Sequence, residues 1–472
     1  MTTAVVVGSG PNGLAAALTL AAAGVAVRVV EAGERPGGGA QSRELTLPGL
    51  LHDESSGFHP LALGSAFAAE HDLAGAGLVW RWPEVQFAHP LDGGRGAAVW
   101  QSVATTVDHL GADGRAWERI FGGLTDRFDT IAPEFLQPVL HVPRHPLHLA
   151  RFGAAAGLPA SVLARAWSTE EGRALFAGAA AHAFRPLTSL ASSAIGVALT
   201  TAAHAFGWPV AEGGTGAITD AVLRRAREHG VQVETGRTVT DLRELGSPDL
   251  VLLDTAPGAA ARIIGPTLPD RVARAYRRYR HGPGAFKVDY AVEGPVPWTH
   301  EASRRAGTLH LGGTLEEVAA TEREVVRGRM PERPFVLVGQ QHLADPSRSN
   351  GDLHPLYAYA HVPAGFTGDA TEAITAQIER FAPGFRDRIR AVHVRTTTDL
   401  ERENANYVGG DIVTGANDAL QLLFRPRVTT RPYATGVPGV YLCSAATPPG
   451  AGAHGMCGHH AARAALRDLA RR

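Results

Sequence analysis

The sequence predicts an α/β fold in which a parallel β-sheet flanked by helices is interleaved with a second domain of mixed β-sheet and helices. Two observations support this prediction. Apolar strands alternate with helices of 3.6-residue periodicity near both ends of the chain, and strand-like runs typical of a mixed sheet follow a largely helical region between them. The 472 residues exceed a single typical domain.

The first element is a strand, turn and helix at the start of the chain. An apolar run over 4–7 leads into the turn 8–13, Gly-Ser-Gly-Pro-Asn-Gly, and then into an Ala/Leu-rich helix. Gly8 permits the tight turn, Gly10 lets the backbone approach a pyrophosphate, and Gly13 lets the helix pack closely on the sheet. The spacing therefore predicts a Rossmann-like dinucleotide site.

The helix start and a distal acid complete this motif. Pro11 suits the first helical turn, and Asn12 and the free amides there face the phosphates, where the helix dipole favours negative charge. Glu31 ends a second apolar strand over 25–30, where a carboxylate can accept hydrogen bonds from a ribose diol. Because this carboxylate repels a 2′-phosphate, we expect an unphosphorylated adenosine.

A second glycine cluster follows within ten residues of Glu31, at 34–40, Glu-Arg-Pro-Gly-Gly-Gly-Ala. Nicotinamide dehydrogenases do not need such a cluster. An extended FAD does, because loop amides and Arg35 can lie along its pyrophosphate and ribityl chain. The alternative is a plain surface turn.

The third cluster lies near the C-terminus. A short apolar strand over 440–443 precedes a small-residue loop, and 456–471 has helical apolar spacing. The backbone amides of Gly455 and Met456 are expected to face N1 and O2 of a flavin, where a helix N-terminus stabilises the anionic reduced ring. The alternative is a loop shaped only for turning.

The segments that carry these signals are separated in the sequence. We expect a discontinuous FAD-binding domain over 1–60, 213–276 and 439–472, in which 218–229 is a helix and 231–233 and 250–253 are strands. The substrate-binding domain would take 61–212 and 277–438. Its helical subdomain near 102–205 has helical spacing over 102–111, 115–131, 159–180 and 189–205, and strands are expected over 285–292, 335–339, 356–361 and 389–394.

Composition excludes several classes of protein. Lys plus Arg number 45 and Asp plus Glu 46, so no global field attracts nucleic acid. Two cysteines, Cys443 and Cys457, form no C-x-x-C pair, which fits a reducing cytosol and argues against a disulfide reductase. The uncharged run 2–27 is broken by the turn 8–13 and has no basic start, so we expect neither a signal peptide nor a membrane span but a cytoplasmic protein.

The histidines give the catalytic and metal candidates. His182 lies in an otherwise apolar helical stretch and is the candidate catalytic residue, although a satisfied core histidine is the alternative. The run 141–148 contains three histidines, but its two prolines prevent helical ligand spacing and no Cys or acid joins them, so no metal is expected. With apolar neighbours, this run is a candidate substrate entrance or peripheral membrane contact. His52 and Asp53 either shape the flavin pocket or, for Asp53, cap a helix.

The three glycine clusters and the ending YLCSAATPPGAGAHGMCGHHAA together resemble the phytoene desaturase and carotenoid oxidoreductase family, within the amine-oxidase-like flavoproteins. The likeness is strongest to the phytoene-dehydrogenase-related branch. The resemblance implies a two-domain protein that binds FAD noncovalently and moves a hydride to or from an apolar substrate. Ser444 stands where such proteins usually have glycine. The expected cofactor-binding residues are Gly8, Ser9, Gly10, Pro11, Asn12, Gly13, Glu31, Ala32, Arg35, Gly38, Gly39, Ala40, Val239, Ser444, Ala445, Gly455 and Met456.

From these motifs we expect an FAD-dependent oxidoreductase that transfers a hydride between flavin N5 and an apolar substrate, by desaturation, saturation or isomerisation of an isoprenoid or lipid-like C–C bond. No second glycine motif with a distal acid follows a strand, so the sequence does not support a stable NAD(P)H site. Oxygen or a quinone is therefore the expected electron acceptor. One alternative is an FAD-dependent amine or amino-acid oxidase. The other is a non-catalytic carrier of prenylated proteins on the same fold.

Overall fold

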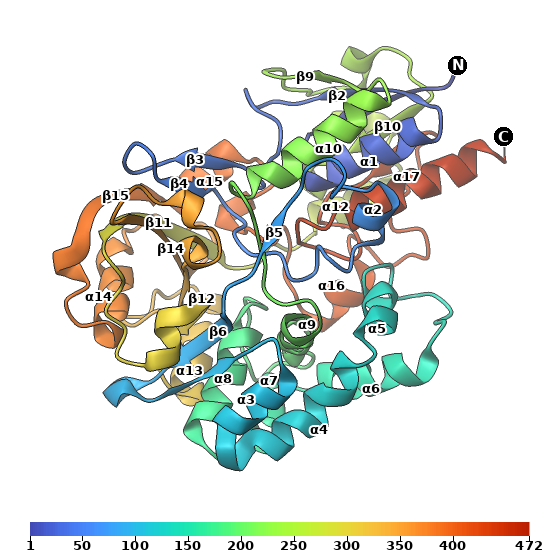
Figure 1. Cartoon of the computed structure of the whole chain (residues 1–472). Coiled ribbons are helices and arrows are strands. Elements are labelled where there is room, and N and C mark those ends of the chain that lie inside the picture. The colour runs from blue at the N-terminus through green and yellow to red at the C-terminus, as the bar shows by residue number, and fades with distance from the viewer. Residues whose placement is uncertain (472) are drawn as a thin grey trace.

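The computed structural model describes residues 1–471, which form two large sheets and a group of helices (Figure 1). The first sheet is parallel throughout, with the strand order β16-β10-β1-β2-β9. Its strands are β1 (Thr3–Val7), β2 (Ala26–Val30), β9 (Gln232–Glu234), β10 (Leu250–Leu253) and β16 (Val440–Leu442). Each of the three segments expected to form the cofactor domain thus contributes at least one strand to this sheet.

Helices cover both faces of the parallel sheet, because its strands are apolar on both faces. Ala4 and Val6 of β1 pack with α1 and α17, whereas Val5 and Val7 pack with α11 and α12. Gly458 permits the close contact of α1 with α17, since a Cβ there would lie 1.7 Å from the carbonyl oxygen of Asn12. The helices of this part are α1 (Pro11–Ala22), α2 (Ala66–Glu70), α10 (Gly216–Glu228), α11 (Pro257–Ile264), α12 (Asp270–Arg277) and α17 (Met456–Leu469).

The second sheet is mixed, with the order β15-β11-β14-β13-β12-β6-β7, in which β6 and β12 are the parallel neighbours. One face packs against α14 (Thr371–Phe381) and the other against α8. Its strands are β6 (Val85–Pro90), β7 (Gly96–Val99), β11 (Gly284–Glu293), β12 (Ala306–Leu311), β13 (Val336–Gly339), β14 (Leu353–Val362) and β15 (Ile389–Arg395). Two short antiparallel pairs, β3 (Ser42–Glu44) with β4 (Leu51–Asp53) and β5 (Trp80–Arg81) with β8 (Val210–Ala211), complete the strands.

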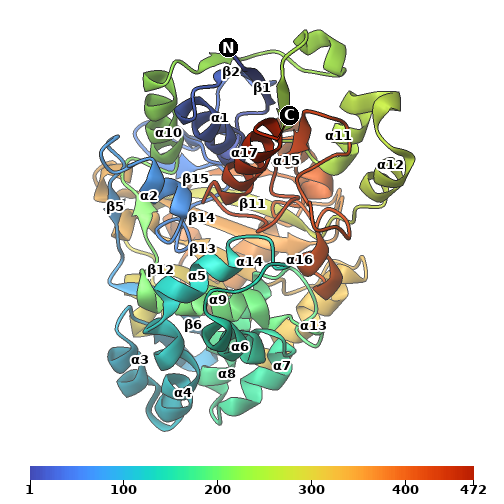
Figure 2. The same ribbon diagram turned by 90° about the vertical axis from the view of Figure 1, so that its right-hand side faces the viewer.

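The helical region lies at the bottom of Figure 1, and Figure 2 shows α5, α6 and α9 below α17. Two expected helices are interrupted. The expected helix 159–180 ends before Trp167, because the buried Asp113 carboxylate accepts hydrogen bonds from the backbone amides of Ser168 and Thr169. The side chain of Thr169 then caps the N-terminus of α8. The expected helix 115–131 breaks between α4 and α5. The helices here are α3 (Val103–Leu110), α4 (Gly114–Thr125), α5 (Phe128–Phe135), α6 (Pro146–Ala156), α7 (Ala160–Leu163), α8 (Glu170–Ala181) and α9 (Ser193–Ala205), followed later by α13 (Leu315–Val326), α15 (Thr397–Glu403) and α16 (Ala419–Phe424).

The arrangement confirms the predicted α/β fold class, a parallel sheet with helices on both faces interleaved with a mixed sheet and helices. Within residues 1–471, no single helix is both long and apolar enough to span a membrane. One bent pair, Pro146–Ala156 with Ala160–Ala166, passes that test jointly at an angle of 91°.

Candidate functional site

The turn between β1 and α1 is packed around one buried carboxylate, Asp254, which directly follows β10. Its Oδ2 accepts the amide of Gly13 at 2.8 Å. A Cβ at Gly8 or Gly10 would lie 2.9 or 2.8 Å from atoms of Asp254, and Gly8 has φ +95°. Burial raises the pKa of Asp254 to about 7, and the nearby charge of Glu31 acts in the same direction. The three glycines are thus required by the backbone geometry of the turn.

Glu31 lies at the end of β2, beside the turn. Its carboxylate accepts the amide and hydroxyl of Ser9 at 2.7 and 2.6 Å and the amide of Gly33 at 2.7 Å. These bonds fix the carboxylate at the mouth of the turn, where a ribose diol could donate to it. Because the ribose would bind the same oxygens, it must share them with these donors.

The second glycine cluster folds back onto the first. The amide of Gly37 donates to the carbonyl oxygen of Ser9 at 3.0 Å, and a Cβ at Gly38 would lie 3.0 Å from the Cα of Gly10. A Cβ at Gly39 would meet the hydroxyl of Tyr407 at 2.0 Å. The cluster therefore packs against the first turn and lines the same site, whereas the glycines of a plain surface turn would have open space around them.

A cavity of about 1700 Å³ runs from these glycine clusters to the helical region. One end is lined by the turn 8–12 and by Glu31, and the other by Phe135, Phe152 and Ile195. Pockets for a single drug-sized ligand usually measure about 300–1,000 Å³. The cavity therefore has room for a dinucleotide and for a second, apolar molecule.

Most of the expected cofactor residues line this cavity, and four do not. Those that line it are Gly8, Ser9, Gly10, Pro11, Asn12, Glu31, Ala32, Arg35, Gly38, Gly39, Ala40, Val239 and Ala445. Gly13, Ser444, Gly455 and Met456 are absent from the lining. The amide of Met456, expected to face a flavin, instead donates to Nδ1 of His454 at 3.1 Å, and the preceding loop 449–454 lines the cavity in its place.

His182 also lines the cavity. Its Nε2 lies 2.8 Å from Nε2 of His310, so one ring donates a hydrogen bond to the other. Burial lowers the pKa of His182 to about 3 and that of His310 well below its ordinary value. Both rings are therefore neutral at pH 7. Trp208 and Tyr359 line the cavity nearby.

Several cavity residues were not singled out from the sequence. Asp254 carries a signal that could have identified it, an acid that directly follows the apolar strand 250–253. Tyr357, Tyr359 and Arg395 come from β14 and β15, where the sequence shows ordinary strand residues. Their place at the cavity depends on the pairing of β11 with both strands.

His52 and Asp53 belong to buried networks. Asp53 accepts the amide of Thr215, the residue that precedes α10, at 2.7 Å, and it pairs with Arg348 at 2.5 Å. His52 lies 3.5 Å from Asp289, which pairs with Lys287. None of these residues lines the cavity, so these groups support the site from behind.

The histidine run 141–148 differs from expectation in two respects. Pro146 occupies the first turn of α6, so His148 is helical, because proline is tolerated at that position. An acid also joins the run: Glu134 accepts from His141 at 2.5 Å and from the amides of Arg144 and His145 at 2.8 and 3.1 Å. These bonds tie the loop to α5, beside the cavity residue Phe135.

Residues 6–67 match the model of an NAD(P)-binding Rossmann-like domain. The rat pyridine nucleotide-disulfide oxidoreductase domain-containing protein 2 is 25% identical over 304 residues, 56% of this chain and 52% of the relative, so the match spans about half of that relative's length. Phytoene dehydrogenase of Streptomyces griseus is 27% identical over 446 residues, 86% of this chain and 80% of the relative. The structure of putrescine oxidase bound to putrescine has a TM-score of 0.62 at 17% identity, covering 100% of this chain and 99% of that one.

These relatives and this structural neighbour carry the names of oxidoreductases. The likeness to putrescine oxidase concerns the fold, since the sequences are only 17% identical. The likeness to phytoene dehydrogenase extends over most of the chain. Residues 6–67 are therefore similar to an NAD(P)-binding Rossmann-like domain, the whole chain shares the fold of putrescine oxidase, and in sequence the chain is similar to phytoene dehydrogenase, the resemblance that its motifs predicted.

Proposed function

We propose that this chain is an FAD-dependent oxidoreductase that transfers a hydride between flavin N5 and an apolar substrate, forming, reducing or shifting a C–C double bond of an isoprenoid or lipid-like molecule. The observation that carries this proposal is the single cavity of about 1700 Å³, which is polar at the glycine turn and apolar in the helical region. Both molecules can therefore occupy one continuous cavity.

The residues at the polar end fit the adenosine and pyrophosphate of FAD. Glycines 8 and 10 let the turn pack closely on Asp254, and Gly38 lets the second glycine cluster pack on Gly10. Pro11 starts α1, so the first amides of this helix would point toward the phosphates. Glu31 would hold the ribose, and Val239, which is buried and lines the cavity, would pack against the adenine. When bound, FAD supplies a ring that accepts or donates a hydride at N5.

The chain's own residues orient the substrate and keep water out. Phe135, Phe152 and Ile195 offer apolar walls, and such walls favour a substrate with few polar groups. His182 presents a neutral imidazole, which His310 holds at 2.8 Å, so it can donate or accept one hydrogen bond but carries no charge. A neutral pair suits a reaction that needs alignment of a C–H bond more than a strong base.

Anaerobic mixing of the FAD-loaded protein with candidate polyenes and other lipids tests the proposal. A true donor bleaches the flavin absorbance, whereas a protein that fails to bind FAD at all would contradict the proposal and favour a carrier of prenyl groups. A substitution of His182 by Phe is expected to leave the FAD content unchanged and to slow bleaching. Equal bleaching rates would remove His182 from the reaction. Adding oxygen or a quinone to the reduced protein identifies the proposed electron acceptor.

One observation favours a second candidate, an amine or amino-acid oxidase. Arg395 is 4% exposed and lines the cavity, and its Nε has no hydrogen-bond partner among residues 1–471. Such a guanidinium can bind a substrate carboxylate. Hydrogen peroxide released with amino acids but not with polyenes, and lost in Arg395→Met, would favour this candidate.

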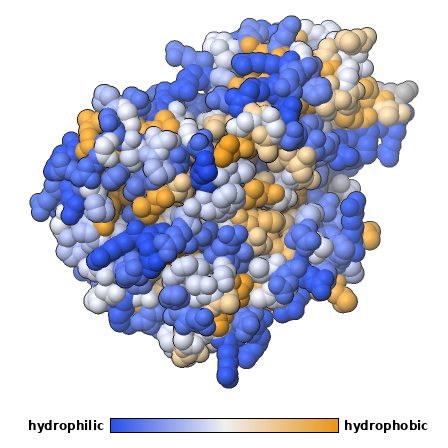
Figure 3. All heavy atoms as spheres, in the orientation of Figure 1, coloured by the Kyte–Doolittle hydropathy of each residue, from blue (hydrophilic) through white to orange (hydrophobic). Residues whose placement is uncertain are grey.

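We also propose that the cavity mouth touches a membrane surface. Exposed apolar side chains lie on the loop before α6 and on α16, and Figure 3 shows apolar residues gathered in the middle of one face, between the upper and lower parts of the molecule. Val139 and Leu423 are 40% and 44% exposed and also line the cavity. Sedimentation with phosphatidylcholine vesicles is expected to weaken in Val142→Asp, since Val142 is 91% exposed. Equal sedimentation would contradict this contact.

A further inference from the structure

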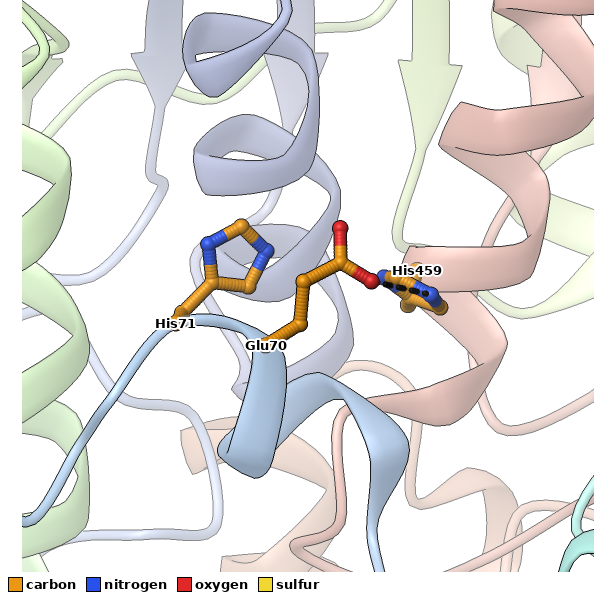
Figure 4. Close-up of side chains that lie close together, drawn as sticks. All are labelled: Glu70, His71 and His459. Atoms are coloured by element: carbon orange, nitrogen blue, oxygen red, sulfur yellow. Dashed lines mark ion pairs between the residues drawn. The ribbon is translucent and has the colours of Figure 1, made fainter.

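Three side chains with metal-ligand chemistry meet at the contact of α2 with α17, and none of them lines the large cavity (Figure 4). Glu70 ends α2, His71 follows it, and His459 lies in the first turn of α17. One ligand atom from each residue lies within 4.8 Å of the others. The glycine turn and the substrate end of the cavity use none of these three groups.

Each imidazole has one nitrogen that can bind a cation, and that of His459 is contacted by Arg463. His71 and His459 are 9% and 1% exposed, and Nε2 of His71 is buried without a hydrogen-bond partner among the described residues. The hydroxyl oxygen of Thr19 lies 3.1 Å from Nδ1 of His459 and can accept its proton, which leaves a lone pair on Nε2.

Glu70 brings negative charge to the two rings. Its Oε2 lies 3.7 Å from Nε2 of His459, and Figure 4 shows the carboxylate between the two imidazoles. Arg463 currently satisfies this charge, with Nη1 3.5 Å from Oε2 of Glu70 and 3.4 Å from Nε2 of His459. Because its side chain is 54% exposed, Arg463 can turn into solvent and release both ligand atoms.

We propose that Glu70, His71 and His459 form a binding site for a divalent transition-metal ion, with zinc as the best fit. Two imidazole nitrogens and one carboxylate oxygen are a common zinc set, with water in the fourth position. Magnesium and calcium fit poorly, since they prefer oxygen ligands. Zinc to nitrogen distances of about 2.0–2.1 Å bring tetrahedral ligand atoms to roughly 3.3 Å from one another, so the side chains must close by at most about 1.5 Å.

The bound ion would join the end of α2 to the first turn of α17. The same turn follows the loop 449–454, which lines the large cavity, and the hydroxyl of Ser65, just before α2, donates to the carbonyl oxygen of His454 at 2.6 Å. The ion would therefore strengthen a contact that already holds this loop. Its expected role is to stabilise the fold, because its ligands lie outside the cavity.

Zinc titration of the whole chain, freed of metal with a chelator, tests the proposal by competition with a chromophoric chelator. We expect one zinc per chain and a higher melting temperature on binding. Glu70→Gln is expected to weaken zinc binding at least tenfold, and Arg463→Ala to strengthen it, because the competing cation is gone. Both side chains are about half exposed, so both variants are expected to fold.

His145→Ala is the matched control, because it removes a histidine from the separate run 141–148 and is expected to leave zinc binding unchanged. Absence of stoichiometric zinc binding would overturn the proposal. So would wild-type affinity in both Glu70→Gln and Arg463→Ala, or a loss of binding confined to His145→Ala. The readout needs neither FAD nor substrate, so it stands independently of the proposed function.

Discussion

A methyl group at Gly13 tests how closely α1 must approach β1. The added Cβ would lie 2.2 Å from the carbonyl oxygen of Gly8 and 2.9 Å from Oδ2 of Asp254. The first contact is 1.2 Å shorter than the 3.4 Å at which ordinary contact begins, and the opposing atom belongs to the backbone. Because a backbone oxygen cannot rotate away, the start of α1 must move.

The energetic cost follows from this displacement. Overpacking of this kind costs about 1–3 kcal/mol of folding stability. The same movement of about 1 Å would take the first amides of α1 away from the pyrophosphate of the proposed FAD. We therefore expect Gly13→Ala to bind FAD at least about tenfold more weakly, or about 1.4 kcal/mol.

Flavin fluorescence quenching measures the FAD affinity, and urea unfolding measures the stability. Gly258→Ala is the matched control: Gly258 lies in α11 of the same part of the molecule, and its Cβ would meet nothing closer than an Arg262 nitrogen at 3.9 Å. The control is expected to bind FAD normally and to gain about 0.5–1 kcal/mol, since alanine favours a helix. Gly13→Ala with the affinity and stability of the control would refute the packing argument.

Three further predictions concern buried charges. Burial lowers the pKa of His204 to about 4, so between pH 6.5 and 5 the unfolded chain binds a proton that the folded chain does not. The free energy of unfolding measured in urea should therefore fall by about 2 kcal/mol per such histidine over this pH range. This fall should be smaller in His204→Gln and the same as in the wild type in the exposed His229→Gln. A slope that stays the same in His204→Gln would contradict this cause. Burial raises the pKa of Asp254 to about 7, so this carboxylate gains its negative charge between pH 6 and pH 8. The charge should repel the phosphates of FAD, so fluorescence titrations should show weaker binding at pH 8 than at pH 6, and Asp254→Asn should remove this difference. A difference that persists in Asp254→Asn would show that the carboxylate does not face the phosphates. Arg348 is 1% exposed and pairs with Asp53 and Asp345, so Arg348→Ala should lower the free energy of unfolding by about 3–5 kcal/mol. Replacing the exposed Arg390 by Ala should change the same free energy, measured by urea unfolding, by less than about 1 kcal/mol. Similar values for both variants would show that burial of the ion pair does not matter here.

The local elements could be predicted because their signals are local. The spacing of glycines 8, 10 and 13 between two apolar runs predicted β1, its turn and α1, and the structure shows why each of these glycines is needed. The strands expected at 250–253 and 285–292 correspond to β10 and β11. Such patterns depend on the alternation of apolar residues within one segment.

Two expectations were wrong because a residue outside the expected segment forms bonds with it. Asp113 ends the expected helix 159–180 from about 55 positions away in the sequence, and Glu134 joins a histidine run that had no acid of its own. None of these partners can be inferred from the spacing within one segment.

The sequence by itself determined the α/β fold class and the kind of ligand that the glycine turn admits, because both depend on residues within about thirty positions of one another. The tertiary structure decided which residues share the cavity. Pairing of β11 with β14 and β15 brings Tyr357, Tyr359 and Arg395 to its wall, and the fold brings His310 to His182 from 128 positions away. It also brings His459 to Glu70 and His71, since only the packing of α17 beside α2 joins groups so far apart in the chain.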